Sequence, residues 1–417
     1  MSQLLQGIFN GISIGSVLLL AALGLAVVFG LMGVINLAHG ELMMLGAYTT
    51  FVVQNVTRSI LPEFEVSDGG FFANAIAFLI SREMYIFYAL IAAFIVAALV
   101  GLALEKGVIR FLYGRPLETL LATWGVSLIL REFVRSVNGM LAIAISMFCV
   151  LFFGALAVLR RRLDWARMRN WAIAANLALS GAIAVVAGIL LFRTQKDFFV
   201  KPWFSARNVD VTAPDWLLRE PIPFPPQGLR NLLGIDSFPL PRVRLFIIAL
   251  TAVCVLGTYL FLNFSDWGLR IRAVTSNRSM SSCLGIPTAT VDALTFALGS
   301  GLAGIAGCAI ALLGSVGPNT GQNYIVDTFM VVVVGGVGNL LGTIFAAMAI
   351  GTVTYLIGSG TLAFLAQPVE ALKPLADVLL FFADTSMAKV MVFILIIVFL
   401  QFKPAGIFAP KGRTAEL

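Results

Sequence analysis

Apolar runs that are long enough to cross a membrane recur along almost the whole chain. A hydrocarbon core about 30 Å thick is spanned by roughly 20 helical residues. Hydrophobic residues make up 59% of the chain and charged residues only 12%, a composition outside the range of soluble domains. We therefore predict an all-α polytopic membrane protein forming one transmembrane domain over 1–417. Nine core spans are expected at 4–31, 41–56, 85–104, 117–137, 245–262, 287–313, 325–334, 343–357 and within 375–400.

Two further apolar runs, 141–159 and 171–192, raise the expected number of crossings to about eleven. They flank the sequence RRRLDWARMR, which carries five arginines in ten residues and favours a cytoplasmic loop by the positive-inside rule. With 265–286 in the cytoplasm, the N-terminus lies outside and the C-terminus inside. The Pro- and Trp-rich stretch 193–244 then becomes an extracytoplasmic loop, although its many basic residues mean that charge alone leaves the orientation open.

The 265–286 segment is a polar stretch between two of these runs. Its arginines cannot lie in hydrocarbon, because a charge at the bilayer centre costs about 3 kcal/mol or more. The spacing is helical, with Leu269, Ala273, Met280 and Leu284 expected to form an apolar stripe. Gly285 should end this segment before Pro287 starts the next helix. The residues alone allow either an ordinary cytoplasmic loop or an amphipathic docking surface.

Small residues suggest where helices approach each other closely. Gly7, Gly11 and Gly15 form a ridge at spacing i, i+4, i+8 in the first run, a pattern typical of helix pairs in membranes. A short internal echo links GVINL at 33–37 with GVGNL at 336–340, each between two apolar runs. Transporters are often built from such repeats. The match is only a few residues long, so a true repeat remains an open alternative.

Several long motifs occur in an order that resembles the membrane permeases of branched-chain amino-acid and urea ABC importers. They are INLAHGELMMLGAY, RPLETLLATWGVSLILRE, SDWGLRIRAVTSNRSMSSCLGI, VDALTFALGSGLAGIAG and GSVGPNTGQNYIVDTFMVVVVGGVGNLLGT. The resemblance covers most of 1–139 and 207–412. It is greatest to the urea permease subunit, through LLATWGVSL and the GSVGP to NYIVD stretch. Residues 140–206 depart from the family pattern and are interpreted as an inserted helical hairpin.

The resemblance implies an ATP-driven importer in the bacterial cytoplasmic (inner) membrane. Its expected partners are a second related permease subunit, two cytoplasmic ATPase subunits, an extracytoplasmic solute-binding protein and membrane lipid, with no nucleic acid. The 265–286 segment would be the cytoplasmic coupling segment on the ATPase, through Arg270, Arg272, Asn277, Arg278, Ser282 and Gly285. The chain has no GxxxxGK[ST] phosphate loop, so we expect ATP and Mg²⁺ to be used by the partner subunits, with no cofactor or metal in this chain.

Polar side chains inside or beside apolar runs are the candidates for a translocation path. They are Asn36, His39, Glu41, Thr123, Trp124, Asn323, Asp327 and Asn339. Each also has a purely structural interpretation. His39 could staple the turn between the first two helices, and Asn36 and Asn339 could fix turns through side-chain to backbone bonds. Asp327 could cap a helix or pair with a basic loop residue. Glu41 could be a helix N-terminal charge, and Trp124 could simply pack.

The predicted function is urea import by alternating access. The alternative within the family is import of a branched-chain amino acid, and the scarcity of basic residues in the apolar runs mildly favours a neutral solute. From another class, an ion-coupled secondary transporter or channel would need membrane carboxylates, for which Glu41 and Asp327 are the candidates. An enzyme is not expected, because His39 has no nucleophile partner and HGE is not a metal-binding HExxH.

Overall fold

The structure is a computed structural model that describes residues 2–62, 81–137, 144, 147–148, 150–152, 154–155, 165–193, 208–224, 238–367 and 373–408. The chain divides into two compact units, one made of 1–127 with 210–417 and the other of 128–209. The described residues are mostly helical, as predicted. The second unit contains α7 (Trp165–Arg193), which covers the predicted run 171–192. The run 141–159 and residues 194–206 of the predicted hairpin lie largely outside the described residues.

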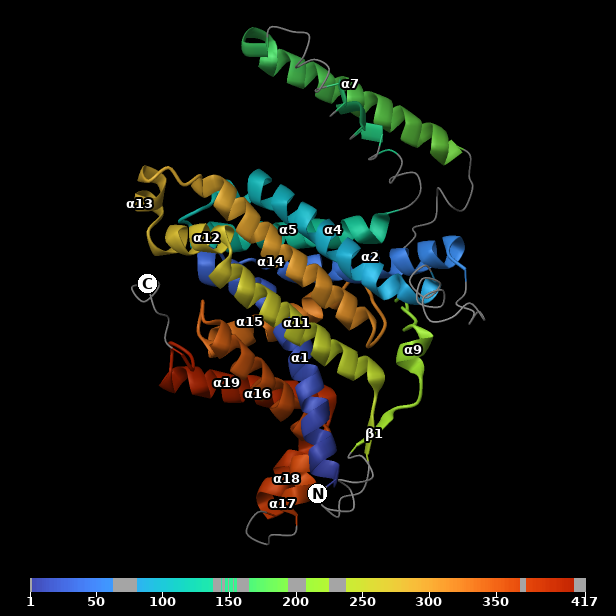
Figure 1. Ribbon diagram of the computed structural model, residues 1–417, viewed down its shortest axis with the longest axis vertical. Helices are drawn as coiled ribbons and strands as arrows, with labels where there is room; N and C mark the ends of the chain where they lie inside the picture. The colour runs from blue at the N-terminus through green and yellow to red at the C-terminus, as the bar shows by residue number, and fades with distance from the viewer. Residues whose placement is uncertain are drawn as a thin grey trace. The chain divides into compact units, whose positions relative to one another are not determined.

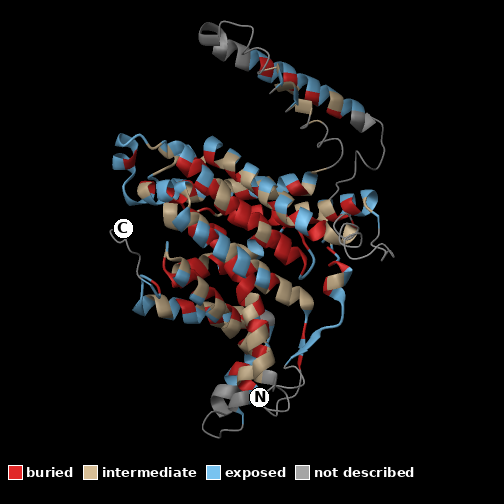
Figure 2. Ribbon diagram, in the orientation of Figure 1, coloured by how far each residue is buried: buried red, intermediate tan, exposed pale blue. Residues whose placement is uncertain are grey.

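Two helices form the centre of the first unit. α1 (Ser2–Met32) and α14 (Thr288–Ala311) are apolar on every side and buried over most of their length, as Figure 2 shows. α16 (Leu340–Gly358), α11 (Arg242–Phe264) and α15 (Thr320–Gly335) pack on α1, while α4 (Tyr85–Gly107) and α2 (His39–Ile60) pack on α14 (Figure 1). The core is lined by Leu, Val and Ala from these helices, including Leu20, Leu23 and Ala306.

Glycines allow these helices to approach closely. The predicted ridge of Gly7, Gly11 and Gly15 lies against α16, where a Cβ on Gly15 would come within 2.9 Å of a backbone oxygen. Gly307 faces the backbone of α2 at Met43, and a Cβ there would clash with that backbone. Backbone atoms cannot move aside as a flexible side chain can, so these contacts require glycine.

The last predicted span, placed within 375–400, corresponds to α19 (Thr385–Phe402). It is preceded by two shorter helices, α17 (Thr361–Ala366) and α18 (Lys373–Phe381). The break between α18 and α19 comes at Asp384, whose carboxylate accepts a hydrogen bond from the Ser386 N–H and caps α19. Among the described residues, five helices are long and apolar enough to cross a membrane: those at 4–32, 82–111, 242–264, 288–311 and 340–358. The number of eleven crossings therefore stays a prediction.

The predicted loop 193–244 contains strands in addition to the turns and short helix that its Pro-rich sequence predicts. Its described part includes α9 (Asp215–Leu218) and a two-stranded antiparallel sheet, β1 (Ile222–Phe224) with β2 (Phe238–Leu240), so the fold is not purely α-helical. The Thr212 carbonyl accepts hydrogen bonds from Gln54 on α2 and Tyr85 on α4, each at 2.6 Å. These bonds attach the loop to one end of the bundle.

The two echoing segments both break a helix at glycines with left-handed backbone. Gly33 (φ 67°) follows α1, and Gly336 (φ 98°) and Gly338 (φ 81°) separate α15 from α16. The breaks are neighbours, because Gly30 lies directly against Gly338. The short turns between α1 and α2 and between α15 and α16 therefore follow from the same local requirement, a residue with no Cβ.

Candidate functional site

The first predicted break folds the chain back into the bundle. The Asn36 side-chain oxygen accepts a hydrogen bond from the Ala38 N–H at 3.0 Å and shapes the turn before α2. His39, fully buried, donates from Nε2 to the Ala21 carbonyl in the middle of α1, at 3.0 Å. α2 therefore begins beside the middle of α1 and not beyond its end. These bonds are the ones that a structural role for Asn36 and His39 requires.

A second set of polar contacts joins this break to α5 (Pro116–Ser136). The buried Glu41 carboxylate accepts a hydrogen bond from the Ser127 hydroxyl at 3.0 Å. One turn earlier on α5, the Thr123 hydroxyl oxygen accepts from the Leu37 N–H at 3.2 Å. Ser127 was missed from the sequence, although its spacing of four residues from Thr123 places both hydroxyls on one face of α5.

The structure does not bring all eight path candidates together. Asn36, His39, Glu41 and Thr123 gather at the first break, but the Trp124 side chain is 54% exposed and Asn323 is exposed. Thr123 lies on the inner face of α5, so the next residue, Trp124, projects from a different face. Trp124 and Asn323 therefore lie apart from the group at the first break, and their place in a translocation path stays a prediction.

The remaining two candidates have separate local roles. Asp327 on α15 forms an ion pair with Lys389 at 2.7 Å. The sequence left open a pairing with a basic loop residue, but the cation comes from the helix α19. Asn339 is the N-cap of α16, where its side-chain oxygen accepts from the Gly342 N–H at 3.2 Å. Lys389 was missed, although it stands inside an apolar run and so meets the criterion that selected the other candidates.

The 265–286 segment forms two short helices and not one continuous stripe. Ser265 caps α12 (Asp266–Ser276) by accepting from the Gly268 N–H at 3.0 Å. Asn277 ends α12 and also caps α13 (Arg278–Cys283), accepting from the Met280 N–H at 3.0 Å. Gly285, at φ 81°, makes the turn into α14, as predicted, and Pro287 is the residue before its first turn.

The apolar stripe predicted for this segment points away from the bundle. Leu269, Met280 and Leu284 are 62%, 58% and 75% exposed, whereas Ile271 and Val274 are buried against Val291 of α14. The direction of the stripe follows from the break at Asn277, which interrupts the helical period. The segment thus presents an apolar surface with basic residues at the end of the bundle, where Figure 1 shows α12 and α13 projecting.

Arg278 ties this segment to α14 and to the turn after α4. Its guanidinium lies 2.6 Å from a carboxylate oxygen of the buried Asp292 and 4.7 Å from the centre of the Tyr113 ring. The Tyr113 hydroxyl in turn donates to Glu105 of α4 at 3.3 Å. Burial raises the pKa of the Tyr113 phenol, so the proton needed for this bond stays in place. We call Arg278, Asp292, Tyr113 and Glu105 the latch.

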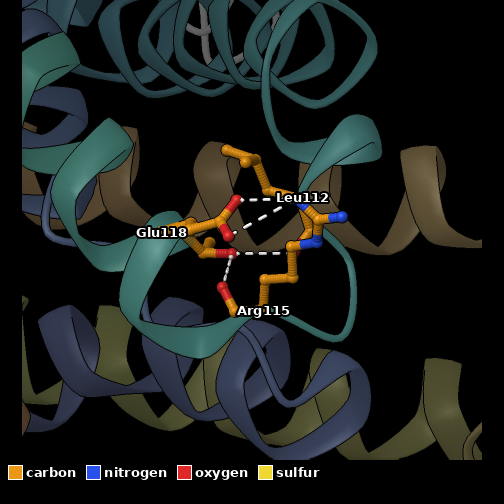
Figure 3. A network of polar contacts seen from close by, with 4 residues as sticks. Leu112, Arg115 and Glu118 are labelled. Atoms are coloured by element: carbon orange, nitrogen blue, oxygen red, sulfur yellow. Dashed lines mark hydrogen bonds and ion pairs between the residues drawn. The ribbon is translucent and has the colours of Figure 1, made fainter.

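The turn that carries Tyr113 is itself fixed by local bonds, drawn in Figure 3. The Thr119 hydroxyl donates to the carbonyls of Leu112 and Arg115 at 3.0 and 2.9 Å. Arg115 and Glu118 form an exposed ion pair at 3.1 Å across the same turn. The Tyr113 ring is therefore held where Arg278 can stack on it. Neither Tyr113 nor Asp292 was singled out from the sequence, although Asp292 is a lone acid in an apolar run.

The other basic residues of the segment make weaker contacts. Arg270 stacks over the Trp267 ring at 4.8 Å, and Arg272 donates to the Asn263 carbonyl at 3.3 Å. Ser282 is exposed on α13. Their exposure is compatible with contact to a second protein.

A cavity of about 950 Å³ opens between α11, α16 and α12, with α1 as its floor. Its walls are mainly apolar and include Leu256, Leu262 and Ile344, and its polar groups include Arg272 and Thr275 of α12. Within the described part of the chain, no cluster of three or more His, Cys, Asp or Glu side chains could hold a metal ion.

The family model for the branched-chain amino acid transport system permease component matches residues 7–140 and 217–400. The high-affinity branched-chain amino acid transport system permease proteins LivH of Escherichia coli K12 and BraD of Pseudomonas aeruginosa are 23% and 22% identical to this chain. Both alignments cover 83% of this chain, with 83% of LivH and 84% of BraD. No solved structure gives a significant match. The predicted localisation in the cytoplasmic membrane is confirmed.

Proposed function

Because the chain belongs to the family of branched-chain amino acid transport permease components, we propose that it is the membrane-spanning subunit of an ATP-driven importer. It works with a second permease subunit, two ATPase subunits that use ATP and Mg²⁺, and a solute-binding protein. The observation that carries this proposal is the 265–286 segment: its exposed apolar surface is what a partner would grip, and the latch connects that surface to α14.

The mechanical role follows from the stiffness of these connections. A displacement of α13 by the ATPase moves Arg278, and the ion pair passes that displacement to Asp292 one turn into α14. α14 is packed by glycines against α2 and α4, so it moves with them as a rigid group. Alternating access would then be a shift of this group relative to the helices around α16.

For the solute, we propose a branched-chain amino acid. The relatives named above carry that description, whereas nothing in the comparisons supports urea. The urea prediction rests on the motifs at 120–128 and 314–327 and on the scarcity of basic residues in the apolar runs. The carboxylates that an ion-coupled transporter would use are engaged locally, Glu41 with Ser127 and Asp327 with Lys389, which favours the ATP-driven mechanism.

The proposal is tested by uptake into proteoliposomes that contain the complete complex. We expect labelled leucine to enter only with ATP and both ATPase subunits, and excess urea to leave that uptake unchanged. Uptake driven by an ion gradient without ATPase subunits would refute the importer mechanism. Competition by urea but not by leucine, isoleucine or valine would restore urea as the solute.

Orientation is tested with Cys283, which is exposed on α13. After the other three cysteines are replaced by serine, a membrane-impermeant maleimide should label Cys283 only in inside-out vesicles. Addition of the ATPase subunits should slow that labelling, because Cys283 lies between the exposed Met280 and Leu284. Labelling from the outside of intact cells would refute the proposed orientation.

A further inference from the structure

The cavity between α11 and α16 has the properties of a site for an amphipathic molecule. Its apolar walls, including Leu256 and Ile344, come from two helices that are each long and apolar enough to cross the membrane. A hollow of about 950 Å³ is at the upper end of the range for small-molecule sites, about 300–1,000 Å³. A cavity of this size at membrane depth fills with an apolar molecule, because its empty walls would lose their packing contacts.

One end of the cavity is basic and polar. Arg272 and Ser276 line it, together with Thr275 and Asn263, whose side chains donate to backbone carbonyls of the protein. A guanidinium carries five N–H donors, and the hydrogen bond from Arg272 goes to the Asn263 carbonyl. Among the residues that the structure describes, no carboxylate lies within ion-pair distance of Arg272. The charge at this end is therefore available to an anion.

We propose that this cavity binds an anionic phospholipid of the cytoplasmic leaflet, with its phosphate at Arg272 and an acyl chain along the groove between α11 and α16. This rests on the proposed orientation, which places α12 at the cytoplasmic headgroup level. Basic pockets between membrane helices at that level bind anionic lipid headgroups. The chain's formal net charge of +7 also favours the binding of anionic lipid.

The position of the site gives the lipid a role in coupling. Arg272 and Thr275 belong to α12, whereas Ile344 and Leu341 belong to α16. A bound lipid therefore touches both the segment that we assign to the ATPase and α16, which packs on α1. It stabilises the arrangement in which α12 lies over the groove, so transport becomes dependent on anionic lipid.

The test measures lipid retained by the full chain, purified with its partner subunits from nanodiscs of phosphatidylglycerol or of phosphatidylcholine. Native mass spectrometry counts the bound lipid during titration. We expect phosphatidylglycerol to bind at least fivefold more tightly than phosphatidylcholine. Arg272→Gln should lower the affinity for phosphatidylglycerol relative to phosphatidylcholine by about fivefold. Arg270→Gln is the matched control: it removes an equal charge from the same helix outside the cavity, and it should keep the preference.

A second variant tests the groove itself. In Ile344→Trp the larger side chain should occupy the groove and reduce the binding of both lipids. If Ile344→Trp does not fold, Leu256→Trp tests the same groove from α11. Equal binding of the two lipids, or an equal effect of Arg272→Gln and Arg270→Gln, would overturn the proposal. So would a high-yield crosslink from Leu341→Cys to the second permease subunit, which would identify a protein as the occupant. Lipid retention is measured without uptake, so its outcome is independent of the solute and of the proposed function.

Discussion

Replacing Arg278 by glutamine should destabilise the chain through the carboxylate that it leaves behind. Asp292 is only 7% exposed at its side chain, and its cationic partner lies 2.6 Å away. Glutamine keeps much of the length of the side chain but removes the charge and the stacking on Tyr113. The variant therefore isolates the electrostatic part of the latch.

The free energy of unfolding that Arg278→Gln should lose lies between two limits. Breaking a fully buried ion pair costs about 3–5 kcal/mol, and breaking an exposed pair costs about 0.2–1 kcal/mol. The Arg278 side chain is 48% exposed, so solvent screens the pair in part. We expect the free energy of unfolding to fall by about 2 kcal/mol in Arg278→Gln. Adding Asp292→Asn removes the unpaired carboxylate charge, so the double variant should recover about 1 kcal/mol of the lost unfolding free energy.

The assay is thermal unfolding of the purified full chain in detergent, combined with ATP-driven uptake by the complex. For a chain of this size we expect the midpoint to fall by roughly 2–4 °C in Arg278→Gln and uptake to fall further than the loss of folded protein explains. For the thermal midpoint, Arg270→Gln is the control for charge, since the Arg270 guanidinium stacks on the Trp267 ring and lies outside the latch. If the losses of unfolding free energy in Arg278→Gln and Asp292→Asn add up in the double variant to within about 0.3–0.5 kcal/mol, the two side chains are not coupled.

Three further variants probe the packing and the caps. Gly307→Leu should prevent α14 from packing on α2 and leave little folded protein in a size-exclusion profile, whereas Gly257→Leu, with open space around its Cβ position, should elute like the unmodified chain. Asn339→Ala should lower the free energy of unfolding by about 1 kcal/mol in a denaturant titration, because α16 loses its N-cap. Lys389→Met should lower the thermal midpoint by leaving the Asp327 carboxylate without its cation, and adding Asp327→Asn should restore most of it; no rescue would argue against the ion pair.

Much of the helical framework could be predicted from the sequence because its signals are local. Hydropathy predicted α1, α4, α11 and α14 to within a few residues, and the turn at Gly285 was predicted from its residue type. The last span was placed only within 375–400, because an apolar composition does not reveal where the helix begins, which here depends on Asp384 capping α19. The two short strands were not predicted, since they lie in a loop whose apolar and polar residues do not alternate clearly.

The candidate site was harder to predict, because its residues meet only through packing. Asn36, His39, Glu41 and Thr123 were found as polar residues in apolar surroundings, and the fold does bring them together. Trp124 satisfied the same criterion but faces outward. Asp292 and Tyr113 were missed because an ion pair between α14 and α13 and a ring beneath Arg278 have no signature in local spacing.

The sequence by itself determined the class of the protein: the length and number of its apolar runs require a helical membrane protein, and its motifs identify the permease family. The caps and glycine turns were also determined locally, since each depends on a residue's own side chain or on the lack of one. Only the tertiary structure decided which polar groups pair across helices, which face of the 265–286 segment is exposed, and where a cavity remains between α11 and α16. These properties depend on the rotation and depth of each helix, which are set by packing over many residues and not by any one of them.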